Sequence, residues 1–119
     1  MTLVTTIGGD PARIDIDTYP GEPVDFTVPV LDANGDPQDL SGWTFAAQVR
    51  ASRDDPVLHT FTLAVDGDGV QVYASPTETA AWADWATSTA RWDLWLTPPA
   101  SPPYLFAAGW VRVETTVTH

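Results

Sequence analysis

Residues 22–50 read EPVDFTVPVLDANGDPQDLSGWTFAAQVR and contain two runs of alternating hydrophobic residues separated by a turn-rich connection. Successive side chains of a β-strand point to opposite faces, so every second residue of a run shares a face. One face of the first run carries Val24, Phe26, Val28 and Val30, and one face of the second carries Trp43, Phe45, Ala47 and Val49. Between the runs, Asn34-Gly35, Asp36-Pro37 and Ser41-Gly42 favour turns. The segment predicts two half-buried antiparallel strands of a β-sandwich.

The strand pattern continues along the rest of the chain. Alternating or apolar runs predict strands at 13–17, 24–30, 43–51, 57–65, 70–74 and 90–97, and 104–106 followed by 109–117 completes the sheet. Pro29 cannot donate a ladder hydrogen bond, which places its strand at a sheet edge or at a bulge. About seven strands of this spacing predict an all-β, immunoglobulin-like antiparallel sandwich. We assign residues 11–119 to this single domain and residues 1–10 to an N-terminal arm.

One short helix is expected near residues 76–86. Ser75 and Glu78 have the spacing of a capping box, and Pro76 stands at the first helical position. The segment that follows supplies good helix formers together with Trp82 and Trp85. We expect two or three helical turns at most.

Composition and charge exclude several classes of function. The 119 residues carry 16 acidic side chains against five arginines, for a formal charge of -11. Such a field repels phosphate backbones, so we expect no direct binding to nucleic acid. Without cysteine the chain forms no disulfide and no thiolate metal site. No run approaches the roughly 18 apolar residues of a membrane span, and we expect no membrane association and synthesis in a cytoplasm.

The sequence predicts no enzyme. His59 lies on the apolar face of a predicted strand, where a histidine is more often a packed side chain than a base, and His119 is the last residue. No G-x-S-x-G or phosphate-binding glycine loop occurs. The aspartates fall in turns or on solvent faces, where solvated acids are the usual reading. We therefore assign no catalytic residue and no cofactor.

A calcium loop is the most attractive metal site on residue types. Asp32, Asn34 and Asp36 begin like an EF-hand loop, but Pro37 replaces the required glycine and Trp43 stands where the bidentate glutamate belongs. An Asx-rich turn between two strands explains the same residues. We favour the turn and assign no metal ligand.

The tryptophans indicate where the chain makes contacts. Trp43 shares a face with Phe45, and Trp92 shares a face with Leu94, which predicts that both lie in the core. Alternation places Trp95 and Trp110 on faces that should be polar. Exposed aromatics and arginines are enriched at interface hot spots, and Arg50 or Arg112 can stack on an indole. The interface candidates are Trp95, Trp110, Arg112, Arg50, Pro98, Pro99, Pro102, Pro103 and Tyr104.

A second explanation accounts for the same two tryptophans. The helix bearing Trp82 and Trp85 could pack over the sheet and cover Trp95 and Trp110. In that case these rings belong to a second packing layer and form no interface. The two explanations have equal weight on the sequence.

The order of the motifs resembles a known family. EPVDFTVPVLDANGDPQDLSGWTFAAQVR, VLHTFTL, SPTETAAWADW, ARWDLWLT and FAAGWVRVETTVT follow one another as in small β-sandwich virion domains of tailed bacteriophages. Such domains occur at the N-terminus of baseplate upper proteins and in the LtfC-like family. The resemblance covers roughly Tyr19 to His119.

The resemblance implies assembly. We expect a bacteriophage virion structural protein, located in the virion, that decorates the capsid or fits into the tail or baseplate. Its partners would be other virion proteins, capsid or tail subunits, and copies of itself. The loop 98–103 and the arm 1–10 would add contacts to the aromatic residues. The alternative is a carbohydrate-binding or adhesin-like sandwich, in which exposed tryptophans stack on sugar rings.

Overall fold

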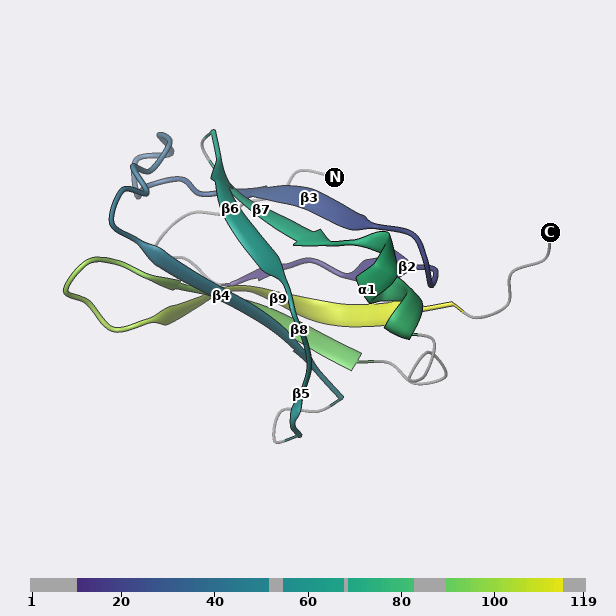
Figure 1. Cartoon of the computed structure of the whole chain (residues 1–119). Coiled ribbons are helices and arrows are strands. Elements are labelled where there is room, and N and C mark those ends of the chain that lie inside the picture. Colours follow the sequence, from purple (N-terminus) through teal and green to yellow (C-terminus); the bar gives the residue numbers. More distant parts are fainter. Residues whose placement is uncertain (1–10, 52–54, 68, 83–89, 115–119) are drawn as a thin grey trace.

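Two β-sheets pack face to face, with one short helix beside them at one end (Figure 1). The computed structural model describes residues 11–51, 55–67, 69–82 and 90–114. The larger sheet runs in the order β1 (Ala12–Arg13), β9 (Tyr104–Val113), β8 (Ala90–Thr97), β4 (Thr44–Arg50) and β5 (Val57–Thr60), and β2 (Ile16–Thr18) also pairs with β9. The smaller sheet contains β3 (Val24–Pro29), β7 (Gly69–Ala74) and β6 (Thr62–Asp66) in that order.

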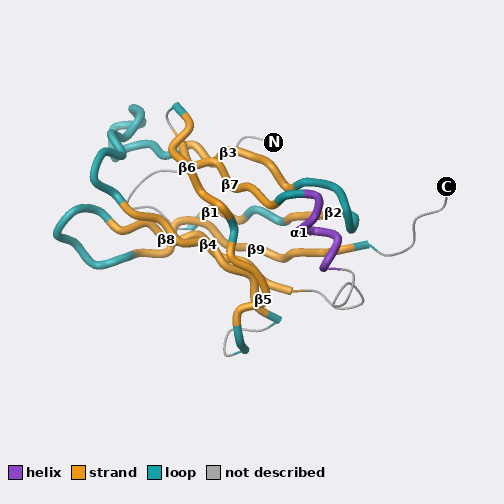
Figure 2. Tube along the Cα trace, in the orientation of Figure 1, coloured by secondary structure: helices purple, strands orange, loops and turns teal. Residues whose placement is uncertain are grey.

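This strand order is that of an immunoglobulin-like sandwich, as the sequence predicted. Strands β9, β8, β4 and β5 correspond to G, F, C and C′ of a variable-type domain, and β3, β7 and β6 correspond to B, E and D. Strands β1 and β2 pair in parallel with β9, whereas the other pairs are antiparallel. The connections 30–43 and 98–103 lie at one end of the sandwich, and α1 (Pro76–Ala80) lies at the other (Figures 1 and 2).

The core lies between the two sheets and follows the predicted alternation. Side chains that the structure buries completely come from both layers: Val28, Val30, Ala47, Val49, Val70, Val72, Ala74, Leu94, Leu96, Ala107 and Val111. Antibody domains join strands B and F with a disulfide. Here the same two strands are joined by Phe26 and Trp92, whose rings meet edge to face with centroids 5.7 Å apart. An aromatic contact therefore bridges the sheets in a chain without cysteine.

The predicted strand 57–65 is in fact two strands in different sheets. Strand β5 belongs to the larger sheet and β6 to the smaller one, and the chain crosses between them at Phe61. The Phe61 amide donates to the Ala47 carbonyl at 2.9 Å, and its ring is buried between the layers. The alternation continues across the crossing, because Leu63 and Val65 of β6 lie opposite the buried Val72 and Val70. Val65 is nevertheless 54% exposed, since it lies near the end of an edge strand. Pro29 does lie in an edge strand, β3.

The run 104–113 forms one strand, where the sequence predicted a break after Phe106. A register shift against β8 at Leu94 and Trp95 leaves both Phe106 and Ala107 buried, which is the local signature of a bulge. Two consecutive buried residues interrupt the alternation in the sequence, and for that reason the run looked like two strands. Residues 115–117 of the prediction lie outside the described part of the chain.

The helix begins where the capping box predicted. The Ser75 hydroxyl accepts from the Glu78 amide at 3.1 Å, and the Glu78 carboxylate accepts from the Ser75 amide at 2.9 Å. Pro76 occupies the first turn of α1, where the amide that proline lacks has no helical acceptor. Trp82, just beyond α1, is buried in the core. Residues 83–89, which include the predicted end of the helix and Trp85, lie outside the described residues.

The predicted strand 13–17 is interrupted at Ile14 and Asp15. The Ile14 amide donates to the Ala108 carbonyl, and the Ile14 carbonyl turns inward and accepts from the Trp92 indole at 2.7 Å. The Asp15 carboxylate accepts from the Trp110 backbone amide at 3.0 Å. At the interruption, two hydrogen bonds that involve side chains, those of the Trp92 indole and of the Asp15 carboxylate, replace backbone hydrogen bonds of the strand ladder. It also brings the Ile14 backbone against Gly109 so closely that a Cβ there would overlap the Ile14 carbonyl.

Candidate interface on the outer face of the larger sheet

The aspartate-rich connection after β3 forms the predicted Asx turn. One carboxylate oxygen of Asp32 accepts from the Asn34 amide at 2.9 Å and from the Asp36 amide at 3.0 Å. The Asp32 amide in turn donates to the Asp36 carbonyl at 2.7 Å. Asp32 therefore closes its own turn. Within the described ranges, no group of three or more histidine, aspartate or glutamate side chains is arranged to hold a metal ion.

His59 is a packed side chain between β5 and the helix. Its ring meets Phe61 and Trp82 edge to face, with centroid distances of 5.1 Å and 4.9 Å. Its Nε2 atom lies 3.9 Å from a Glu78 carboxylate oxygen and makes no hydrogen bond with the described residues. Burial lowers the pKa of His59 from its ordinary value of 6.5, and the charge of Glu78 opposes this shift. The surroundings are those of a core-edge histidine, as the sequence predicted.

The lowered pKa of His59 predicts a pH-dependent stability. Well above pH 6.5 the imidazole is neutral in both folded and unfolded chains, and its contribution to stability is constant. As the pH falls through 6.5, His59 becomes protonated in the unfolded chain but stays neutral in the folded chain, where its pKa is lower. The free energy of unfolding therefore decreases between pH 6.5 and the folded-state pKa. Urea unfolding of the wild type and His59→Leu at several pH values measures the effect. We expect the wild type to lose stability relative to the variant as the solution is acidified, and a pH-independent difference would contradict the assignment.

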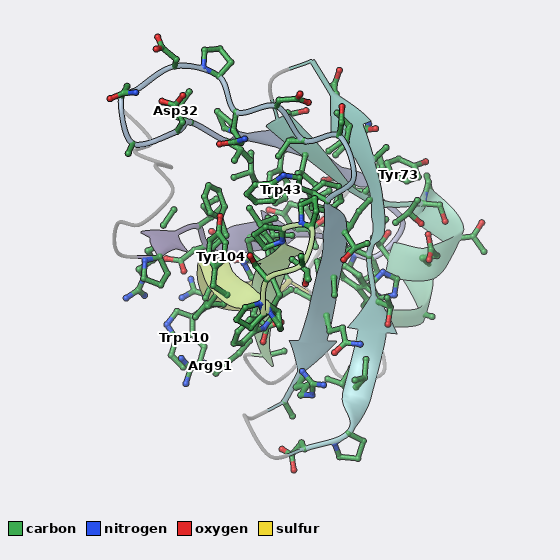
Figure 3. All side chains as sticks on the ribbon, turned by 90° about the vertical axis from the view of Figure 1, so that its left-hand side faces the viewer. Asp32, Trp43, Tyr73, Arg91, Tyr104 and Trp110 are labelled. Atoms are coloured by element: carbon green, nitrogen blue, oxygen red, sulfur yellow. The ribbon has the colours of Figure 1, made fainter. Side chains whose placement is uncertain are left out.

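The outer face of the larger sheet carries both exposed tryptophans. Trp95 on β8 is 38% exposed and Trp110 on β9 is 40% exposed. The strand register places Trp110 opposite Arg91, and it places Arg91 opposite Arg50 of β4. Figure 3 shows Trp110 and Arg91 side by side, on a different side of the molecule from Tyr73 of the smaller sheet. We use the term outer face for these outward side chains of β1, β2, β4, β8 and β9 and of the segment between β1 and β2: Arg13, Asp15, Asp17, Gln48, Arg50, Arg91, Asp93, Trp95, Leu105, Ala108, Trp110 and Arg112.

Trp95 and Trp110 were predicted either to form an interface or to lie under the helix that bears Trp82 and Trp85. The described residues distinguish these two explanations. Trp82 does not cover the outer face, because its ring packs against His59 and Phe61 beside the core. Both tryptophans of the outer face keep more than a third of their surface exposed. The prediction that Trp82 covers Trp95 and Trp110 is therefore wrong. Trp85, the other tryptophan of that prediction, lies outside the described residues.

Arginine is concentrated on the outer face. Of the five arginines in the chain, Arg13, Arg50, Arg91 and Arg112 are described, and all four belong to this face. Three of them pair with a neighbouring carboxylate: Arg13 with Asp15 at 3.5 Å, Arg50 with Asp93 at 4.0 Å, and Arg112 with Asp17 at 3.9 Å. The outer face is thus close to neutral in a strongly acidic molecule.

Arg91, and not Arg50 or Arg112, is the arginine that stacks on an indole. Its guanidinium carbon lies 5.0 Å from the centroid of the Trp110 ring, within the range of a cation–π contact. The sequence reasoning missed Arg91. The signal was present, because Arg91 alternates with Asp93 and Trp95 along one strand and therefore shares their face. What the sequence lacked was the register that puts β8 and β9 side by side.

A hollow of about 360 Å³ opens on the outer face next to Trp95. The side chains that line it include Arg50, Arg91, Asp93, Trp95 and Leu105. Burial raises the pKa of the Asp93 carboxyl, while the charge of Arg50 and a hydrogen bond from the Trp95 side chain oppose the shift. The hollow therefore offers cationic, anionic and aromatic groups within one concave surface.

The proline candidates and Tyr104 lie outside this hollow. Pro98 to Pro103 form the loop between β8 and β9, in which Ala100 has a positive φ of 57° and Ser101 donates to the Pro98 carbonyl. Pro99, Pro102 and Pro103 are exposed, whereas Pro98 is half-buried. The side chain of Pro99 approaches Gly42, so the two loops at this end of the sandwich touch.

Tyr104 packs inward and is not part of the outer face. Its ring meets Trp43 and Phe106 edge to face, each with a centroid distance of 6.4 Å (Figure 3). Burial raises the pKa of the Tyr104 hydroxyl, which has no hydrogen-bond partner among the described residues. Trp43 is half-buried and packs against the edge of the core. Trp92 lies in the core as predicted and is more deeply buried than Trp43, since it is 1% exposed.

Comparison with known proteins assigns no relationship to the chain. No protein-family model matches it, and no curated protein matches its sequence. The described residues include no helix with the length and apolar character needed to cross a membrane.

Proposed function

We propose that this chain is a bacteriophage virion structural protein, an accessory β-sandwich subunit that docks through the outer face onto capsid or tail proteins. The observation that carries the proposal is the outer face itself. It combines two exposed tryptophans with four arginines in a protein that has five basic residues in all. Tryptophan and arginine are the residue types most enriched at interface hot spots. The motif order quoted from the sequence supports the choice of a virion protein.

The distribution of charge supports docking by the outer face. A formal charge of -11 makes the rest of the surface repel other acidic surfaces and nucleic acid. On the outer face, the ion pairs of Arg13, Arg50 and Arg112 remove most of that repulsion. A partner can therefore approach this face at a lower electrostatic cost than the unpaired acidic parts of the surface. Many copies would remain soluble until they meet that partner.

Replacing Trp110 with alanine should leave the domain folded and weaken its incorporation into virions. The exposed ring contributes little to the core, whereas loss of a central aromatic contact weakens an interface by about 2 kcal/mol, roughly thirtyfold in affinity. The measurement is the amount of tagged protein in purified virions produced with the variant as the sole copy. Thermal unfolding of the isolated variant checks that the fold is retained.

Tyr73→Ala is the matched control for this experiment. Tyr73 also projects from a strand, but it belongs to the smaller sheet. We expect its loss to leave incorporation unchanged. If Tyr73→Ala abolished incorporation while Trp110→Ala did not, the docking surface would lie on the smaller sheet. Absence of the wild-type protein from purified virions would overturn the virion assignment itself.

A carbohydrate-binding module is the second candidate, and the hollow is the observation that favours it. Trp95 could stack on a sugar ring, and the Asp93 carboxylate in the same hollow could accept from sugar hydroxyls. Trp95 and Trp110 are not neighbours in the register, because Trp95 lies opposite Leu105 and Trp110 lies opposite Arg91. A sugar site would therefore centre on Trp95 alone. Quenching of tryptophan fluorescence by neutral oligosaccharides, abolished by Trp95→Ala, would support this candidate.

A further inference from the structure

We infer that the hollow beside Trp95 is a receptor for a carboxylate side chain presented by an acidic segment of a partner protein, with Arg91 as the residue that binds it. This inference rests on the proposed docking function and names the chemistry of the docked partner. Arg91 is the one described arginine without an ion pair to a described carboxylate. Its guanidinium is exposed, lies over Trp110 and lines the hollow.

The position of Arg91 is unfavourable in the isolated domain. The register sets it directly opposite Arg50 on the neighbouring strand. Like charges at directly opposed positions of an antiparallel pair destabilise a sheet. Asp93 compensates Arg50 at 4.0 Å, and no corresponding carboxylate compensates Arg91 in the described part of the chain. An incoming carboxylate would relieve this repulsion and form charge-assisted hydrogen bonds with a planar guanidinium.

The surroundings of Arg91 indicate which residue stands next to the carboxylate in the bound segment. Trp95 and Leu105 form an apolar wall of the same hollow. The ring of Trp110 holds the guanidinium from one side, which reduces the side-chain freedom that binding would remove. An acidic residue next to an aromatic or aliphatic residue fits this combination. The occupant is thus an acidic, partly apolar protein segment.

A nucleic-acid strand does not fit the same surface. A phosphate backbone presents a row of charges and needs a row of unpaired cations. Here the other three described arginines are already paired, and Asp15, Asp17 and Asp93 lie among them. Among the described arginines, one guanidinium is left for an anion. That stoichiometry suits a single carboxylate.

The test uses the whole chain and two peptides that differ in one charge. N-acetyl-Glu-Phe-amide and N-acetyl-Gln-Phe-amide are titrated into ¹⁵N-labelled protein, and the indole N–H signals of Trp95 and Trp110 are followed by NMR. Loss of a hydrogen bond between charged groups costs about 1.5–3 kcal/mol, so we expect the glutamine peptide to bind at least roughly tenfold more weakly.

Variants locate the binding site on Arg91. Arg91→Gln should lower the affinity for the glutamate peptide to that for the glutamine peptide. Arg112→Gln removes the same charge from the same face, but from an arginine already paired with Asp17, and should leave the affinity unchanged. Arg91→Lys should restore part of the affinity, because it keeps the charge and loses the planar fork.

Several outcomes would overturn the inference. These are equal binding of both peptides, no saturable shift up to the solubility limit of the glutamate peptide, or an equal loss in Arg112→Gln. Tighter binding of a single-stranded oligonucleotide would overturn it in favour of nucleic acid. The proposed function is tested separately. If Trp110→Ala blocks virion incorporation and Arg91→Gln does not, docking by the outer face stands and carboxylate recognition fails.

Discussion

Replacement of Trp92 with alanine should destabilise the domain by about 3–5 kcal/mol, the range for removal of a large aromatic side chain from a core. The indole is 1% exposed and meets Phe26 and Phe61 edge to face, so it connects β8 to the smaller sheet and to the crossing between the sheets. It also donates to the Ile14 carbonyl at 2.7 Å. Alanine would leave both a cavity and a buried acceptor without its donor.

Two companion variants separate these effects in urea unfolding. Trp92→Phe keeps most of the packing and removes the hydrogen bond to Ile14, so we expect an intermediate loss of stability. Trp43→Ala removes a ring of the same size from a half-buried position and should cost less than Trp92→Ala. If Trp43→Ala proved the more damaging of the two, the core would not centre on Trp92 as described.

Replacement of Gly109 with alanine should cost roughly 2–4 kcal/mol, at the upper end for a methyl group added to a packed site. The Cβ would overlap the carbonyl oxygen of Ile14 and crowd its carbonyl carbon and the Asp15 carboxylate. A backbone cannot move aside as a flexible side chain can. The variant must therefore shift the segment at Ile14 and Asp15 away from β9, which breaks the Trp92 and Trp110 hydrogen bonds to that segment.

Hydrogen exchange provides a local measurement of this second prediction. The Trp92 indole N–H and the Ile14 and Trp110 amides should exchange faster in Gly109→Ala, while amides of the smaller sheet keep their protection. Gly67→Asn is the control, because Gly67 has a positive φ of 59° that asparagine tolerates and no atom lies within 4 Å of its Cβ position. Equal stability of Gly109→Ala and the wild type would show that the two backbones do not approach as closely as described.

The sequence predicted local features with good accuracy because each depends on a few neighbouring residues. The capping box of Ser75 and Glu78 and the Asx turn of Asp32 are both set within four residues or fewer. The alternation at 90–97 predicted β8 with its bounds unchanged. These signals reflect the backbone geometry of the segment itself. They do not depend on what lies across the sheet.

The errors arose where the chain responds to distant residues. The strand at 57–65 divides at Phe61 because the two halves pair with different sheets, and a continuous alternation gives no sign of that change. The run 104–113 stays continuous because a bulge against β8 accommodates two adjacent buried residues. The interruption at Ile14 depends on Trp92, 78 residues further along the chain, and on Gly109 beyond it.

In the candidate interface too, features that depend on local sequence were predicted, and features that depend on distant residues were missed. Alternation alone placed Trp95 and Trp110 on an outward face, and both are exposed. Tyr104 was also an interface candidate, whereas the bulge in β9 turns its ring toward Trp43. Arg91 was missed because its significance comes from its cross-strand neighbours, Arg50 and Trp110.

By itself, the sequence from 22 to 50 and its continuation determined that this protein is a β-sandwich, since the period of the hydrophobic residues fixes which side chains can be buried together. It also determined the acidic charge and the outward aromatics. Only the tertiary structure decided the register of β4, β8 and β9, which brings Arg50, Arg91 and Trp110 into one row. Register depends on bulges and on packing between distant segments, and no local pattern records it.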